Sequence, residues 1–168
     1  MSGLKLAMAA VAVLGLTACS SNPWNDDLNG SAGAGGAGAA AGALDPASPA
    51  YFRQTVGDRV LFANDQSSLS PQAQTTLQGQ ARWLARNADY VVTIEGHADE
   101  KGTREYNLGL GAKRANAARE YLMSQGVAGS RIKVVSFGKE RPLEICSDEV
   151  CYSKNRRAVT VLAGGLTG

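Results

Sequence analysis

The hydrophobic pattern of residues 51–168 changes in a regular order between strand-like runs and helix-like spacing. Ser70-Pro71 is typical of a helix start, and apolar residues follow it at spacings of three and four; the same spacing recurs over residues 108–122. Short runs rich in β-branched and aromatic residues predict strands at 59–62, 90–97, 131–138 and 157–162. Strands and helices alternate, with a cysteine-bracketed loop before the last strand, so we predict a layered α/β domain of the α+β type.

The first residues have the pattern of an export signal. Residues 1–18 contain one charge, Lys5, then an apolar run and small residues, which is typical of a secretory signal peptide and too short to span a bilayer. Leu16-Thr17-Ala18-Cys19 resembles a bacterial lipobox, which predicts cleavage before Cys19 and lipid on its new N-terminus. Several acyl chains there would form a durable membrane anchor. The alternative is a plain signal peptide with an incidental cysteine.

A low-complexity segment separates this signal from the patterned part of the chain. From 30 to 43 every residue is Gly, Ala or Ser, so the segment has no side chains with which to form a core. Its glycines argue against a helix. We therefore predict a leader over 1–18, the lipidated cysteine and a flexible tether over 19–50 with a span of roughly 30 Å, and a folded domain over 51–168. Composition also allows a spacer without functional consequence.

The charge of the chain excludes two classes of protein and argues against one class of partner. The formal net charge is +2, and residues 51–168 hold 16 of the 17 basic and 12 of the 15 acidic residues. This balance excludes an acidic tail protein and a histone-like polycation. The acidic residues interleaved with basic ones and the export signal argue against a nucleic-acid partner.

The two cysteines of the folded part predict a disulfide. Apart from Cys19, the exported chain has the even pair Cys146 and Cys151. Such a short loop is stabilised by only about 2 kcal/mol in the chain-entropy model, so the bond would mainly fix the shape of the loop. A metal site is the alternative, but its ligands run short because His97 is the one histidine of the chain. We expect no metal, and no cofactor other than the lipid on Cys19.

Charged residues at the ends of two predicted strands are candidates for a ligand site. Asp65 follows the first strand and the run 95–102 ends the second, where ligands of layered α/β sheets gather. Arg114 lies close to the start of the predicted second helix, where an anion would balance it. Solvated surface charge is the plain alternative for each. An enzyme is a further alternative because Glu95, His97 and Asp99 alternate along one strand, but no Ser or Cys nucleophile is paired with His97. We therefore expect no enzymatic activity, and a partly buried His97 that hydrogen-bonds locally or lines the pocket.

Three separated motifs resemble a known family. The stretches 96–117, 136–142 and 152–159 are similar to the core motifs of OmpA-like peptidoglycan-binding domains, and the match runs from about residue 57 to 163. Together with the lipobox they resemble the peptidoglycan-associated lipoprotein family of the Tol-Pal system. The resemblance implies a βαβαβ(β) sandwich with a mixed four-stranded sheet. The loop between Cys146 and Cys151 departs from the common pattern.

The resemblance also implies a function and its residues. Such domains bind the diaminopimelate of the peptidoglycan stem peptide without cleaving it, through an Asp and an Arg that match Asp99 and Arg114. Asp65 and Asn107 match supporting residues, and Arg157 is a weaker match. Arg suits a ligand carboxylate because its planar fork binds in a bidentate manner.

The implied place of the protein is the cell envelope. It would tether the outer membrane to the wall from the periplasm, in envelope integrity and cell division, with TolB and other Tol proteins as partners. Two alternatives stay open at this point: an OmpA-like lipoprotein of another envelope complex, and a structural spacer that binds a protein partner.

Overall fold

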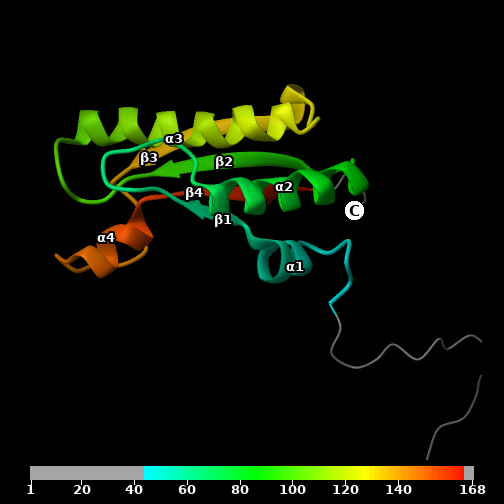
Figure 1. Ribbon diagram of the computed structural model, residues 1–168, viewed down its shortest axis with the longest axis horizontal. Helices are drawn as coiled ribbons and strands as arrows, with labels where there is room; N and C mark the ends of the chain where they lie inside the picture. Colours follow the sequence, from blue (N-terminus) through cyan, green and yellow to red (C-terminus); the bar gives the residue numbers. More distant parts are fainter. Residues whose placement is uncertain (1–43, 165–168) are drawn as a thin grey trace, which may run out of the picture. The chain divides into compact units, whose positions relative to one another are not determined.

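A computed structural model describes residues 44–164 as a four-stranded sheet with two long helices packed on it (Figure 1). The sheet order is β1-β4-β2-β3; β2 and β3 are parallel, and the other neighbouring pairs are antiparallel. The mixed four-stranded sheet is thereby confirmed. The elements are α1 (Pro49–Tyr51), a π-helix (Phe52–Gly57), β1 (Arg59–Leu61), α2 (Pro71–Arg86), β2 (Val91–His97), α3 (Arg104–Ser124), a 3-10 helix (Gly129–Arg131), β3 (Ile132–Gly138), α4 (Glu149–Asn155) and β4 (Arg157–Ala163).

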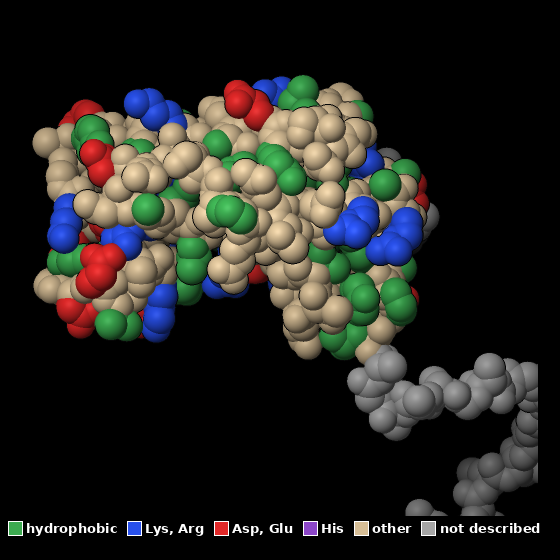
Figure 2. All heavy atoms as spheres, viewed as in Figure 1, with side chains coloured by type: hydrophobic (Ala, Val, Ile, Leu, Met, Phe, Trp, Pro, Cys, Tyr) green, Lys and Arg blue, Asp and Glu red, His purple; other side chains and the backbone are tan. Residues whose placement is uncertain are grey.

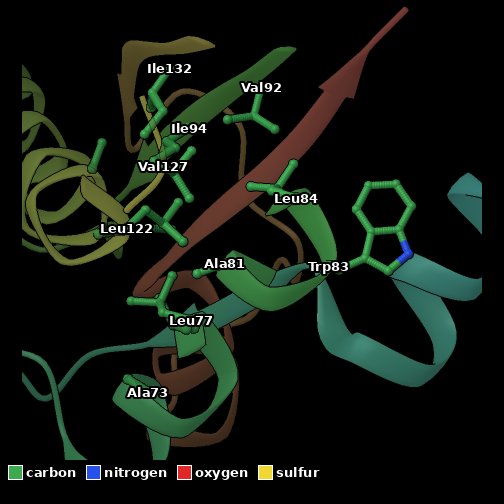
Figure 3. Packing of buried hydrophobic residues seen from close by; sticks show 14 of the residues in the cluster. Ala73, Leu77, Ala81, Trp83, Leu84, Val92, Ile94, Leu122, Val127 and Ile132 are labelled. Atoms are coloured by element: carbon green, nitrogen blue, oxygen red, sulfur yellow. The ribbon is translucent and has the colours of Figure 1, made fainter. Parts of the chain in front are cut away.

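The hydrophobic core lies between the sheet and the helices α2 and α3 (Figure 3). Leu77 and Leu84 of α2 and Leu122 of α3 are fully buried against Ile94 of β2. Burial of such side chains contributes about 1.5–3 kcal/mol each relative to leaving them exposed. Within residues 44–164, no helix combines the length and the apolar composition needed to cross a membrane.

The folded part of the chain begins earlier than residue 51. The indole Nε1 of Trp83 donates a hydrogen bond to the carbonyl oxygen of Pro46 at 2.8 Å, and the Trp83 ring packs on Phe52 at 4.9 Å between centroids. Ser48 caps α1 by accepting from the backbone N–H of Tyr51. The prediction from composition placed Pro46 and Ser48 in the tether because the neighbouring residues are small. The predicted leader, Cys19 and residues 20–43 lie outside the described residues.

Two helices differ from the sequence-based prediction. The side chain of Thr103 caps α3, which begins at Arg104 and not at residue 108. The first turn was missed because residues 104–106 are exposed and carry no hydrophobic period. Arg114 is thus ten residues inside the helix, and the expectation of an arginine at the helix start is wrong. The loop bracketed by the cysteines runs into the short helix α4, which Asp148 caps and which continues past Cys151 to Asn155.

Glycines allow α3 to lie directly on β2. A Cβ placed at Gly96 would lie 1.9 Å from the carbonyl oxygen of Gly111, and a Cβ at Gly111 would lie 2.5 Å from the hydroxyl of Ser136. This backbone contact brings the first half of α3 over the ends of β2 and β3. The helix can therefore supply side chains to a site at that edge of the sheet.

Candidate functional site

A cleft of about 300 Å³ lies at the end of the sheet where β1 and β2 terminate. In Figure 1 the loop after β1, the loop between β2 and α3, and α4 all lie at the left end of the sheet. Three of the sequence-predicted residues, Asp65, Asp99 and Asn107, line this cleft. The structure therefore brings these polar groups from two strand ends into one cleft, and their contact with a ligand stays a prediction. The other lining residues are Asn64, Lys101, Gly102, Tyr106 and Leu110.

Asp65 is held at the rim of the cleft in a left-handed backbone conformation. Its φ is 54°, which Asp tolerates better than most residues. The hydroxyl of Tyr106 donates a hydrogen bond to Asp65 Oδ1. This bond, with Asp65 as its charged acceptor, raises the pKa of Tyr106. The exposed carboxylate has further lone pairs for a ligand.

Asp99 is the buried acid of the cleft. It is only 6% exposed; Oδ1 accepts from the backbone N–H of Lys101 at 3.2 Å, and Oδ2 accepts from Nη1 of Arg156 at 3.2 Å. Arg156 also donates through Nε to the carbonyl oxygen of Phe62 at 3.2 Å and through Nη2 to Glu149. The hydrogen bond to Glu149 raises the pKa of Arg156. Arg156 therefore joins the Asp99 loop both to the end of β1 and to α4.

Arg157, the weaker match, does not reach the cleft. It donates to the carbonyl oxygens of Asn155 and Arg141, at 3.3 and 3.2 Å. Arg157 is not among the cleft-lining residues, and its contact with a ligand stays a prediction. The neighbouring Arg156, which ends α4 as its C-cap, donates to Asp99 but does not line the cleft itself. No pattern in the sequence separates the two arginines.

Arg114 lies beneath the cleft and is fully buried. Its Nε donates to the carbonyl oxygen of Gln66 at 2.8 Å, Nη1 to that of His97 at 2.9 Å, and Nη2 to that of Ala63 at 3.2 Å. Burial lowers the pKa of Arg114 to about 10, and the charge of Asp99 partly opposes this. The side chain is thus a cation that ties the Asp65 loop to the end of β2. It is not among the cleft-lining residues, and its direct contact with a ligand stays a prediction.

Asn107 holds in place the loop 99–102, which forms one side of the cleft. It is buried, and its Nδ2 donates to the carbonyl oxygen of Lys101 at 2.8 Å. Nζ of Lys139 donates to the carbonyl oxygen of Gly102 at 2.7 Å. The side chains of Asn107 and Lys139 therefore donate hydrogen bonds to two consecutive carbonyl oxygens of the loop 99–102. These two bonds fix the shape of the loop.

His97 does not belong to the cleft. It is 2% exposed, and neither ring nitrogen has a hydrogen-bond partner within the described part of the chain. Its Nε2 lies 3.7 Å from Oε2 of Glu95, whereas Asp99 turns away to Arg156. The expected local hydrogen bond is therefore absent from the described structure. No purple side chain is visible on the face drawn in Figure 2, over which both acidic and basic side chains are spread.

Acid should destabilise the fold through His97. Burial and the charges of Arg157 and Arg141 lower its pKa from 6.5 to about 4. Since the unfolded chain binds this proton below about pH 6.5 and the folded chain only near pH 4, stability is full above pH 6.5 and falls as the pH drops toward 4. The loss approaches about 3 kcal/mol. Urea unfolding at pH 7 and pH 4.5 measures it, and His97→Leu should remove this part of the acid sensitivity; an equally acid-sensitive variant would contradict the assignment.

The Cys146 and Cys151 sulfurs are bonded to each other, with 5.8 Å between the Cα atoms. These cysteines and Asp148 form the one group of metal-type ligands found among residues 44–164, and the bond takes both sulfurs out of such a role. The disulfide closes the turn into α4. Sequence reasoning missed Tyr106 and Lys101, which line the cleft, and Arg156, which donates to the lining residue Asp99; none has a spacing signal of its own.

Comparisons with known proteins agree with the resemblance. The model of the OmpA family matches residues 61–156. The "Peptidoglycan-associated lipoprotein" of Mesorhizobium japonicum is 50% identical over 159 residues, which cover 94% of this chain and 90% of that protein. The protein of the same name from Rhizobium meliloti is 51% identical over 159 residues, which cover 94% of this chain and 86% of that protein. The crystal structure of the peptidoglycan-associated lipoprotein from Burkholderia pseudomallei has a TM-score of 0.66 at 37% identity and covers 71% of this chain and 100% of that one.

Proposed function

Since this chain belongs to the OmpA family and, within it, to the peptidoglycan-associated lipoproteins, we propose that it binds peptidoglycan non-covalently. The ligand is the diaminopimelate of the stem peptide, held in the cleft between Asp65, Asp99 and Lys101. The observation that carries the proposal is the presence of both charge signs in one open cleft, with a buried arginine beneath it.

The charges of the cleft complement a zwitterion. The free end of diaminopimelate has an ammonium and a carboxylate. Asp65 and Asp99 offer carboxylate oxygens to the ammonium, and the Lys101 ammonium and the buried charge of Arg114 attract the carboxylate. Charge-assisted hydrogen bonds contribute roughly 1.5–3 kcal/mol each. A few such bonds suit a reversible attachment that is repeated along a polymer.

The proposed role is binding rather than catalysis. His97 is neutral near pH 7 because its pKa is lowered to about 4, and it lies outside the cleft lining. Asp99 is engaged by Arg156, and no serine or cysteine is among the lining residues. A general base paired with a nucleophile therefore has no place in this cleft.

The proposal includes the place of the protein in the cell. Lipid on Cys19 would anchor the chain in the outer membrane, and the segment 20–43 would span part of the distance to a wall-bound domain in the periplasm. Both lie outside the described residues. The relatives named above support a lipoprotein. Membership of the Tol-Pal system and binding to TolB are part of the proposal, and co-purification with TolB would separate it from an OmpA-like lipoprotein of another envelope complex.

The proposed function is tested by sedimentation with insoluble peptidoglycan. The full-length chain in mild detergent should sediment with diaminopimelate-containing wall and not with lysine-containing wall. Asp99→Asn should weaken binding about 10- to 100-fold, because it removes one charge-assisted hydrogen bond to the ligand ammonium.

The matched control is Glu105→Gln, which removes an exposed acidic charge from the first turn of α3, outside the cleft lining. It should bind the wall as the wild type does. Equal binding of both walls, or binding indifferent to Asp99→Asn in a variant with wild-type unfolding, would contradict the diaminopimelate site. Absence of wall binding would favour the alternative of a spacer that binds a protein partner.

A further inference from the structure

The segment between β3 and β4 lies against the loop that carries Asp99. The hydroxyls of Ser147 and Tyr152 both donate to Oε1 of Glu100, at 3.0 and 2.9 Å. The Lys101 ammonium lies 4.5 Å from the centroid of the Tyr152 ring. Glu100 and Lys101, the two residues that follow Asp99, are thus contacted by one short stretch of chain, residues 143–155, which we call the bracket.

A second connection runs to Asp99 itself. Glu149, in the first turn of α4, accepts a hydrogen bond from Nη2 of Arg156, and Nη1 of the same guanidinium donates to Asp99. The pKa of Glu149 is lowered by this hydrogen bond. The planar fork of arginine fixes the two acids relative to each other. A shift of α4 therefore changes the orientation of the Asp99 carboxylate.

The disulfide closes the bracket. It joins Cys146, directly before Ser147, to the buried Cys151 of α4. Between them, Asp148 caps the helix by accepting from the backbone N–H of Cys151 at 3.1 Å. At the other end, Asn155 Oδ1 accepts from the backbone N–H groups of Leu143 and Glu144, at 2.7 and 3.1 Å. The bracket lies outside the hydrophobic core cluster.

We propose that the bracket positions Asp99 for the ligand and that the Cys146–Cys151 bond keeps it closed, so that wall binding depends on the oxidation state of this pair. The inference rests on the proposed function. With a dithiol reductant, the S–S bond breaks, two cysteine thiols form, and the reductant closes to its own disulfide. Residues 146–151 then regain conformational freedom, Ser147 and Glu149 leave their partners, and the Asp99 carboxylate loses its fixed orientation. The sheet stays folded because the core does not include the bracket.

The test compares oxidised full-length protein, the same protein in dithiothreitol, and the double variant Cys146→Ser/Cys151→Ser. Wall affinity should fall roughly fivefold or more on reduction, within the range typical of coupling between neighbouring sites. The double variant should bind as the reduced protein does, and dithiothreitol should not change it further. Glu105→Gln is again the matched control, because Glu105 lies in the first turn of α3, outside both the bracket and the cleft lining; it should bind normally and stay sensitive to reduction.

A second measurement follows the positioning of Asp99 in the absence of peptidoglycan. Amide hydrogen exchange at Lys101, whose N–H is bonded to Asp99, should accelerate on reduction, while exchange in β2 and the thermal midpoint of the core change little. The proposed role of the bracket would be overturned if the oxidised and the reduced protein had equal wall affinity and equal amide exchange at Lys101, with both thiols titrated after reduction. If the oxidised protein does not bind the wall, the proposed function fails, and the exchange at Lys101 still decides whether the bracket positions Asp99.

Discussion

Gly96→Ala is expected to destabilise the domain by more than about 3 kcal/mol, a large share of the 5–15 kcal/mol that holds a typical domain together. The added Cβ would lie 1.9 Å from the carbonyl oxygen and 2.6 Å from the carbonyl carbon of Gly111, and 3.1 Å from Cβ of Ala115. Backbone atoms cannot rotate away as a side chain can, so α3 has to move off the sheet. Overpacking of a core against movable side chains already costs about 1–3 kcal/mol.

Urea unfolding monitored by circular dichroism measures this loss. Gly109→Ala is the matched control, because Gly109 lies in the same helix α3 and a Cβ there meets no atom within 4 Å. That substitution should stabilise the domain by up to about 1 kcal/mol, the difference in helix propensity. Similar unfolding free energies for the two alanine variants would show that the contact between β2 and α3 is not as close as described.

Arg114→Met should cost both stability and wall binding. Methionine is similar in length but has no donor, so the carbonyl oxygens of Gln66 and His97 lose this donor, and that of Ala63 keeps the backbone N–H of Gln66. Hydrogen bonds from a charged donor contribute about 1.5–3 kcal/mol each, so the expected loss for the three bonds exceeds about 3 kcal/mol. The loop after β1 is then free of the end of β2, and Asp65 no longer has a fixed place relative to Asp99.

The outcome is measured by urea unfolding and by wall sedimentation at a temperature where the variant is still folded. Arg114→Lys keeps the charge but lacks the planar fork, so it should restore part of the stability and little of the binding. Lys113→Met removes an exposed cation from the neighbouring position and should change neither quantity. A wild-type unfolding free energy for Arg114→Met would contradict the role of these three hydrogen bonds.

Arg114 also joins the candidate site to the fold. The same side chain that orders two loops carries a positive charge beneath the two acids of the cleft. A ligand carboxylate would meet a cation whose position is already set, so little conformational entropy would be lost on binding. Because structure and proposed recognition share this residue, only variants that separate charge from geometry, such as Arg114→Lys, can divide its two roles.

Much of this protein was determined by local sequence. Alternation and helical spacing predicted the four strands and the helix that Ser70 caps, because these periods reflect which residues face the core. The positions of Asp65 and Asp99 shortly after two strands placed both acids at the same end of the sheet. The cysteine pair was predicted from its spacing and from the predicted export signal.

The remaining features were decided by contacts between residues far apart in the chain. Arg114 pairs with carbonyls 17 to 51 residues away, and Arg156 reaches Asp99 across 57 residues. Neither pairing leaves a periodic signal, and the contact of Arg156 with Asp99 depends on where the end of α4 meets the loop after β2. The polar first turn of α3 and residues 46–50 were missed for the same reason: their partners come from other elements, and hydrophobic periodicity records burial but not which distant group provides it.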